Sequence, residues 1–120
     1  MRTGWSVLID VVVIIIFAII GRASHAEVLS LAGIAQTAWP FLVAGVGASG
    51  LAFGVGRLQW WQEGVIVWLA AAVGGLLLRV VSGGTAAVPF IIVATLTLGL
   101  LLVGWRVIGR LATRGRRAAA

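Results

Sequence analysis

The sequence predicts an all-α integral membrane protein with four transmembrane helices in a small bundle. Composition is the first observation behind this: 62% of the 120 residues are hydrophobic and 10% are charged, whereas a soluble domain is nearer half apolar and a quarter charged. The second is that the apolar residues form four blocks, each near the ~20 residues that cross a bilayer as a helix. The length allows one domain.

The predicted elements are the spans 5–21, 39–56, 65–81 and 87–107, followed by a basic tail at 108–120. Lipid offers backbone groups no hydrogen-bond partner, so each span is expected to be a helix. Thr37 is a candidate N-cap of the second span, with Pro40 in its first turn, and Thr85 is a candidate N-cap of the fourth. Residues 82–85, Ser-Gly-Gly-Thr, indicate a turn.

Two segments allow alternative interpretations. Residues 27–36 place apolar side chains at helical spacing and fit either a short helix on the membrane interface or an ordered loop. The first apolar block also has features of a cleavable secretory signal. We interpret it as a span, because Asp10 interrupts the apolar run and cleavage would leave a three-helix protein.

The arginines predict the orientation in the membrane. Five of the nine basic residues fall in the last fifteen positions, and four spans place both termini on one side. Because cytoplasmic flanks collect basic residues, both termini are expected in the cytoplasm. The arginines of the tail are expected to contact anionic lipid headgroups rather than nucleic acid; they are Arg110, Arg114, Arg116 and Arg117.

Asp10 is the charge of most interest, since it lies about 7 Å inside the first span at the α-helical rise. Helical spacing puts it on one face with Ser6, Ile14, Phe17 and Gly21. Arg106 reaches a similar depth on the fourth span, so an Asp10–Arg106 contact is predicted. Its role is either an ion pair that pins two helices together or a protonatable, cation-binding carboxylate in a pathway.

A second charged group is expected at the outer face. Arg79, near the outer end of the third span, lies at the depth of Arg22, His25 and Glu27, which follow the first span. These residues form either an anion or lipid site, or a set of arginines that reach headgroups and cap carbonyls. A lone histidine with one glutamate is a poor metal site. We therefore expect no metal, no cofactor and no catalytic residues.

The segment GVGASG, residues 45–50, matches the glycine fingerprint of a dinucleotide-binding turn. That interpretation fails, because the segment lies inside an apolar helix rather than between a strand and a helix. Gly47, Gly50 and Gly54 instead follow helical spacing and predict a smooth face for close helix packing. The partner of this face is its own bundle, a second copy or another protein.

The chain resembles a family of small four-helix prokaryotic membrane proteins known as domain of unknown function 3054. The resemblance extends from Asp10 to Arg106 and rests on short segments in a fixed order. These are Asp10, Gly21-Arg22-x-x-His25, Trp39-Pro40-Phe41, Val67-Trp68, Arg79, Pro89-Phe90-Ile91-Ile92-Val93 and Gly104-Trp105-Arg106. It implies a multi-pass protein of the prokaryotic cell membrane, with no activity attached.

Two functions are compatible with these features. The first is a small transporter or ion pathway that uses Asp10 as its charged element, formed where subunits of a homo-oligomer meet. The alternative is a non-catalytic accessory or assembly subunit that packs against another membrane complex. An enzyme is disfavoured, since the sequence offers no nucleophile–base pair and no acidic metal cluster.

Overall fold

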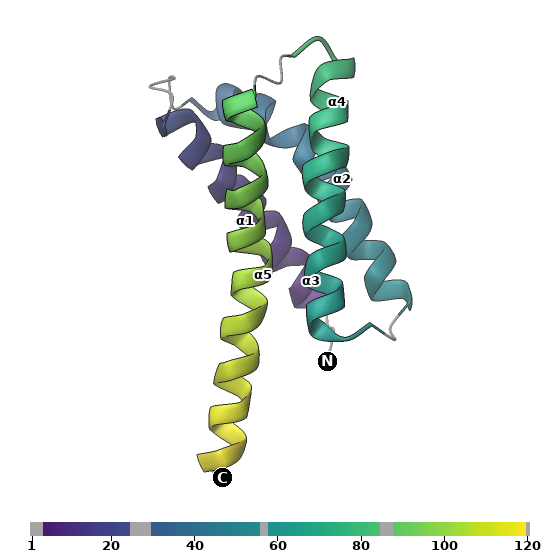
Figure 1. The fold of residues 1–120 in the computed structure, drawn as a ribbon, viewed down its shortest axis with the longest axis vertical. Coiled ribbons are helices and arrows are strands. Elements are labelled where there is room, and N and C mark those ends of the chain that lie inside the picture. Colours follow the sequence, from purple (N-terminus) through teal and green to yellow (C-terminus); the bar gives the residue numbers. More distant parts are fainter. Residues whose placement is uncertain (1–3, 25–29, 56–57, 85–87, 120) are drawn as a thin grey trace.

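The computed structural model describes residues 4–24, 30–55, 58–84 and 88–119, with Ser24 and residues 114–119 as backbone only. Every regular element in these ranges is a helix, and four stretches are long and apolar enough to cross a membrane. The predicted fold class is confirmed. Figure 1 shows both termini at the same end of the bundle, which we term the terminal end; the opposite end is the far end.

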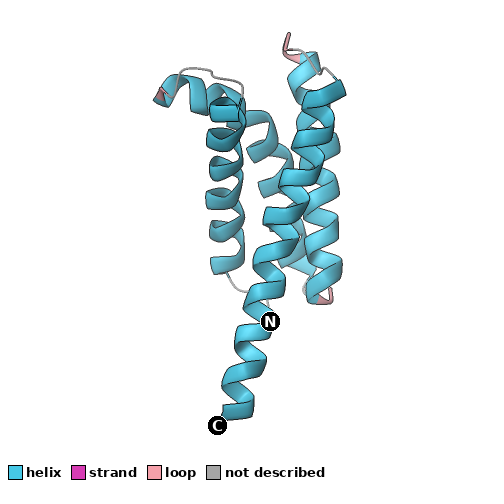
Figure 2. Ribbon diagram, turned by 60° about the vertical axis from the view of Figure 1, so that its left-hand side comes forward, coloured by secondary structure: helices cyan, strands magenta, loops and turns pink. Residues whose placement is uncertain are grey.

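The helical segments follow one another along the chain as four spans, the third of which is divided into three segments without a break. They are α1 (Gly4–Ser24), α2 (Leu31–Val55), α3 (Trp60–Leu69), the π-helix η1 (Ala70–Gly74), α4 (Gly75–Val81) and α5 (Val88–Ala119). Successive spans run in opposite directions, and α5 continues past the other helices at the terminal end (Figures 1 and 2).

The second span begins earlier than the sequence suggested, at Leu31. Ser30 precedes it, and its hydroxyl oxygen accepts a hydrogen bond from the Gly33 N–H at 3.0 Å, as an N-cap does. The prediction of Thr37 as N-cap is therefore wrong, because Ser30 offers the same kind of acceptor two turns upstream. Thr37 and Pro40 are buried inside the helix.

Residues 31–36 are accordingly the first turns of α2, and neither a separate interfacial helix nor a loop. Residues 27–29 lie outside the described ranges. The third span also begins early, at Trp60, after the Gln59 N–H donates to Gln62 Oε1 at 2.9 Å. This start places Glu63 in the first turn of a helix, although it lies between the predicted spans 39–56 and 65–81.

The predicted turn after the third span is confirmed for residues 82–84. Gly83 has a positive φ of 97°, and the Gly84 N–H donates to the Arg79 carbonyl at 2.8 Å, which closes the helix end. Thr85, the predicted N-cap of α5, lies outside the described ranges. At its other end α5 reaches Ala119, so the basic tail continues the fourth span as a helix.

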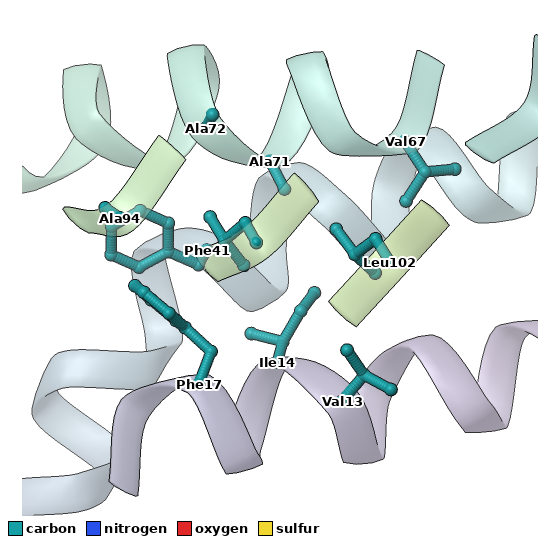
Figure 3. Packing of buried hydrophobic residues seen from close by; sticks show 10 residues of the cluster. Val13, Ile14, Phe17, Phe41, Val67, Ala71, Ala72, Ala94 and Leu102 are labelled. Atoms are coloured by element: carbon teal, nitrogen blue, oxygen red, sulfur yellow. The ribbon is translucent and has the colours of Figure 1, made fainter. Parts of the chain in front are cut away.

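Figure 3 shows the apolar core, where side chains from all four spans point toward a common centre. Phe17 of α1 and Phe41 of α2 meet there edge to face, with ring centroids 5.0 Å apart. The buried members are Val13, Ile14, Phe17, Phe41, Val67, Ala71, Ala72, Ala94, Leu98 and Leu102.

Glycines let the helices approach one another closely around this core. A Cβ added to Gly75 would overlap the ring of Phe41, and one added to Gly99 would lie 2.7 Å from Cε2 of Trp68. The Trp68 indole also donates to the Thr95 carbonyl of α5 at 2.8 Å. Between helices in lipid, contact is stabilised by packing and hydrogen bonds, so small residues at crossings are needed.

The π-helix η1 lies in the middle of the third span. Segments α3 and α4 on either side of it have different main neighbours, α5 for the first and α2 for the second. Because a π-turn holds an extra residue, it rotates the helix that follows relative to the helix that precedes it. The third span thus presents one face to α5 and a different one to α2.

The close contact at Gly75 gives a stability prediction. We expect Gly75→Ala to lower the unfolding temperature in detergent, since overpacking costs about 1–3 kcal/mol. Gly47→Ala is the matched control: an added Cβ at Gly47 meets nothing within 4 Å, and alanine favours a helix over glycine. Equal stability of Gly75→Ala and the wild type would contradict the packing described here.

Candidate functional site

Polar side chains from four helices meet near the terminal end of the bundle. We term them the Asp10 cluster: Asp10 of α1, Ser49 of α2, Glu63 of α3, and Trp105 and Arg106 of α5. The predicted contact between Asp10 and Arg106 is confirmed. The cluster links the terminal end of every span.

Asp10 is fully buried and accepts four hydrogen bonds. Arg106 forms a two-pronged pair with it, from Nη1 to Oδ1 at 2.8 Å and from Nη2 to Oδ2 at 2.7 Å. Trp105 Nε1 also donates to Oδ1 at 2.9 Å, and Ser49 Oγ donates to Oδ2 at 2.7 Å. A carboxylate has room for about four such bonds, so the acceptor capacity of Asp10 is filled.

Arg106 joins Asp10 to a second carboxylate. Its Nε donates to Glu63 Oε1 at 2.9 Å, and its Nη1 also donates to the Leu102 carbonyl one turn back at 2.9 Å. The guanidinium carbon lies 4.5 Å from the centre of the Trp105 ring. The Arg106 side chain is only 3% exposed, which makes these partners necessary.

Small residues place these groups within reach of one another. Gly45 lies one turn from Ser49 on α2, and a Cβ there would be 2.7 Å from Cδ1 of Ile14, which lies one turn from Asp10 on α1. This approach of α2 to α1 brings the Ser49 hydroxyl to the carboxylate. Gly64 has the same role beside Glu63, since a Cβ there would lie 3.0 Å from Cδ of Arg106.

The Asp10 cluster is a buried network of ion pairs and hydrogen bonds in which Asp10 has no acceptor capacity left. Removing a charged group from water is costly, and the cost is offset here by direct, short, charge-assisted hydrogen bonds. On the far side of Asp10 the apolar core follows at once, beginning with the fully buried Ile14 and Leu102. In this conformation the carboxylate is shielded both by its donors and by that core.

The other predicted charged residues lie apart from the cluster. Arg22 Nη1 donates to Thr37 Oγ1 at 3.2 Å, so it contacts α2. Arg79 lies over α5, with its guanidinium carbon 4.5 Å from the centre of the Phe90 ring. His25 and Glu27 lie outside the described ranges, and an outer anion or lipid site involving these residues stays a prediction.

The glycine face of α2 points away from the bundle. Gly47, Gly50 and Gly54 are exposed, and a Cβ added to any of them would meet nothing within 4 Å. These glycines therefore do not serve close packing inside this bundle. Of the three predicted partners for this face, a second copy or another protein stays a prediction.

A family model described as a protein of unknown function, DUF3054, matches residues 7–109. The chain belongs to the DUF3054 family. No curated protein and no solved structure matches it. The match includes every member of the Asp10 cluster, so the cluster lies within the DUF3054 domain.

Sequence reasoning identified two members of the cluster in this DUF3054 protein and missed three. Glu63 lies between the predicted spans 39–56 and 65–81, yet as one of only three acidic residues it is a natural partner for a buried arginine. The sequence signal for Trp105 was its position directly before Arg106. Ser49 gave no signal beyond its place within the apolar segment 39–56.

The cluster predicts energetic coupling between α1 and α5. We expect Asp10→Asn and Arg106→Gln each to destabilise the protein by about 3–5 kcal/mol, because each leaves a buried charge without its main partner. The double variant is expected to lose less than the sum, with a coupling of about 0.5–3 kcal/mol. Reversible unfolding in mixed micelles measures all three.

The control is the same cycle with Arg79→Gln in place of Arg106→Gln. Arg79 contacts α5 from α4 and does not touch Asp10 in the described structure, so its effect should add to that of Asp10→Asn. Additive effects for the Asp10–Arg106 pair itself would show that the two side chains do not depend on each other.

Proposed function

We propose that this DUF3054 protein is a non-catalytic membrane subunit that binds another membrane-spanning helix through the outward face of α2. The proposal rests on the observation that the Asp10 carboxylate is buried and fully hydrogen-bonded. A carboxylate inside a span is a functional-site hypothesis by default, but here its hydrogen-bonding capacity is filled by Ser49, Trp105 and Arg106. The Asp10 charge is therefore accounted for by its contacts within the bundle. The proposed function accordingly uses the outer surface of the bundle and not this carboxylate.

The interior beyond the cluster supports the same conclusion. An ion that left Asp10 toward the far end would have to pass Ile14 and then the Phe17–Phe41 pair, all of which are at most 2% exposed. An ion pathway through a single copy would therefore require the packed core to open. A binding role requires no such change.

The outward face of α2 supplies the binding surface. Glycine in a helix costs about 1 kcal/mol relative to alanine, and Gly47, Gly50 and Gly54 bring no compensating contact inside the bundle. In membranes, such a face lets a second helix backbone approach closely. A partner helix would thus account for residues that the fold of one chain does not.

A second candidate is the ion pathway suggested by the sequence, and one observation favours it. Glu63 lies in the first turn of α3, so the cluster extends from Asp10 to the terminal end of the bundle. In this role Arg106 would break its hydrogen bonds to Asp10 and keep its hydrogen bond to Glu63 during a transport cycle. The two candidates differ in whether purified protein alone moves ions.

Purification of the native protein in mild detergent, followed by native mass spectrometry, tests the binding role. We expect a complex of defined stoichiometry, lost in Gly50→Leu because the added side chain blocks helix approach. Gly104→Leu on α5 is the matched control, since an added Cβ there also meets nothing within 4 Å. Gly50→Leu itself is expected to keep the stability of the wild type.

Reconstitution into liposomes with pH and membrane-potential dyes decides between the candidates. We expect no flux from the purified chain. Flux that disappears in both Asp10→Asn and Ser49→Ala, with the protein still folded, would reject the binding role in favour of the pathway. A monomer without any partner in the native preparation would count against the proposal as well.

A further inference from the structure

Helix α5 is longer than the membrane requires. From Val88 to Ala119 it has 32 residues, or about 48 Å at the α-helical rise. The part from Val88 to Arg106 accounts for about 27 Å, close to the ~30 Å of a hydrocarbon core. The rest projects past the other helices at the terminal end (Figures 1 and 2).

The Asp10 cluster marks where the bundle ends on α5. Arg106 is bonded to Glu63 in the first turn of α3, so this level is the terminal end of the third span. Beyond it the described side chains are exposed: Ile108 is 69% and Leu111 is 59% exposed, and Arg110 is exposed too. We term residues 108–119 the α5 extension.

The α5 extension has a basic side and an apolar side. Helical spacing places Arg110, Arg114 and Arg117 along one side, and Ile108 and Leu111 on another. The segment contains four arginines, including Arg116, and no acidic residue. Its charge is therefore not balanced within the extension itself.

We propose that the α5 extension binds the anionic lipid headgroups of the membrane that its own helix crosses. The positions along the helix favour this partner. Arg110 lies about 6 Å beyond Arg106, at the depth of the headgroup layer, and Arg117 lies about 17 Å beyond it. All four arginines thus fall within about two Debye lengths of the surface.

The apolar side of the extension agrees with this partner. Ile108 lies about 3 Å beyond Arg106 and can contact the upper acyl chains, while Leu111, about 8 Å beyond it, lies at the headgroup boundary beside Arg110. A nucleic acid would use the arginines but would leave both apolar side chains in water. This inference does not depend on the proposed role of α2.

The full-length chain in nanodiscs of equimolar phosphatidylglycerol and phosphatidylcholine tests the inference. Native mass spectrometry counts the lipids of each kind that stay bound on release. The wild type is expected to retain phosphatidylglycerol preferentially, at about fivefold per arginine at low salt. Replacing Arg110, Arg114, Arg116 and Arg117 with Gln should reduce the preference at least about tenfold.

The matched control replaces the same four arginines with Lys, which keeps the charge and should keep most of the preference. Because the extension projects beyond the bundle, neither variant should change the unfolding temperature. A Gln variant with the phosphatidylglycerol preference of the wild type would overturn the inference. So would a DNA oligonucleotide that displaces phosphatidylglycerol from the wild type, which would assign the surface to nucleic acid.

Discussion

The terminal end of this protein depends on one guanidinium group held inside an apolar bundle. Arg106 is almost fully buried, so its donors need acceptors on neighbouring helices, and those acceptors are Asp10 of α1 and Glu63 of α3. Ser49 and Trp105 then complete the shell of Asp10. Since no single helix can supply these groups, the buried charge specifies which helices meet and at what depth.

This charge pairing matters because apolar contact alone does little to select which helices pack together in lipid, where acyl chains are as apolar as leucine. Glycines add the second constraint. Gly45 and Gly64 lie beside the Asp10 cluster, and Gly75 lies against Phe41 in the core. Close approach and charge pairing support each other, because the hydrogen bonds require short distances between helices and the glycines permit them.

The sequence was sufficient for the number and order of the spans and for the Asp10–Arg106 pair, since hydropathy gives depth and helical spacing gives the face. It was insufficient where two local signals competed. Ser30 and Thr37 are both good N-caps, and the sequence does not show which of them is used; in the structure the helix begins after Ser30, and Thr37 accepts a hydrogen bond from Arg22 within it. Glu63 was missed because it lies between the predicted spans 39–56 and 65–81, whereas the helix already starts at Trp60.

The π-helix in the third span has a consequence for how this domain tolerates change in length. One residue more or less turns the remainder of an α-helix by about 100°. Restoring a regular helix across Ala70–Gly74 would leave Glu63 facing Arg106 but would swing Gly75 away from Phe41. The π-helix η1 thus sets the rotation of α4 relative to α3. This rotation lets one span contact Arg106 near one end and Phe41 near the other.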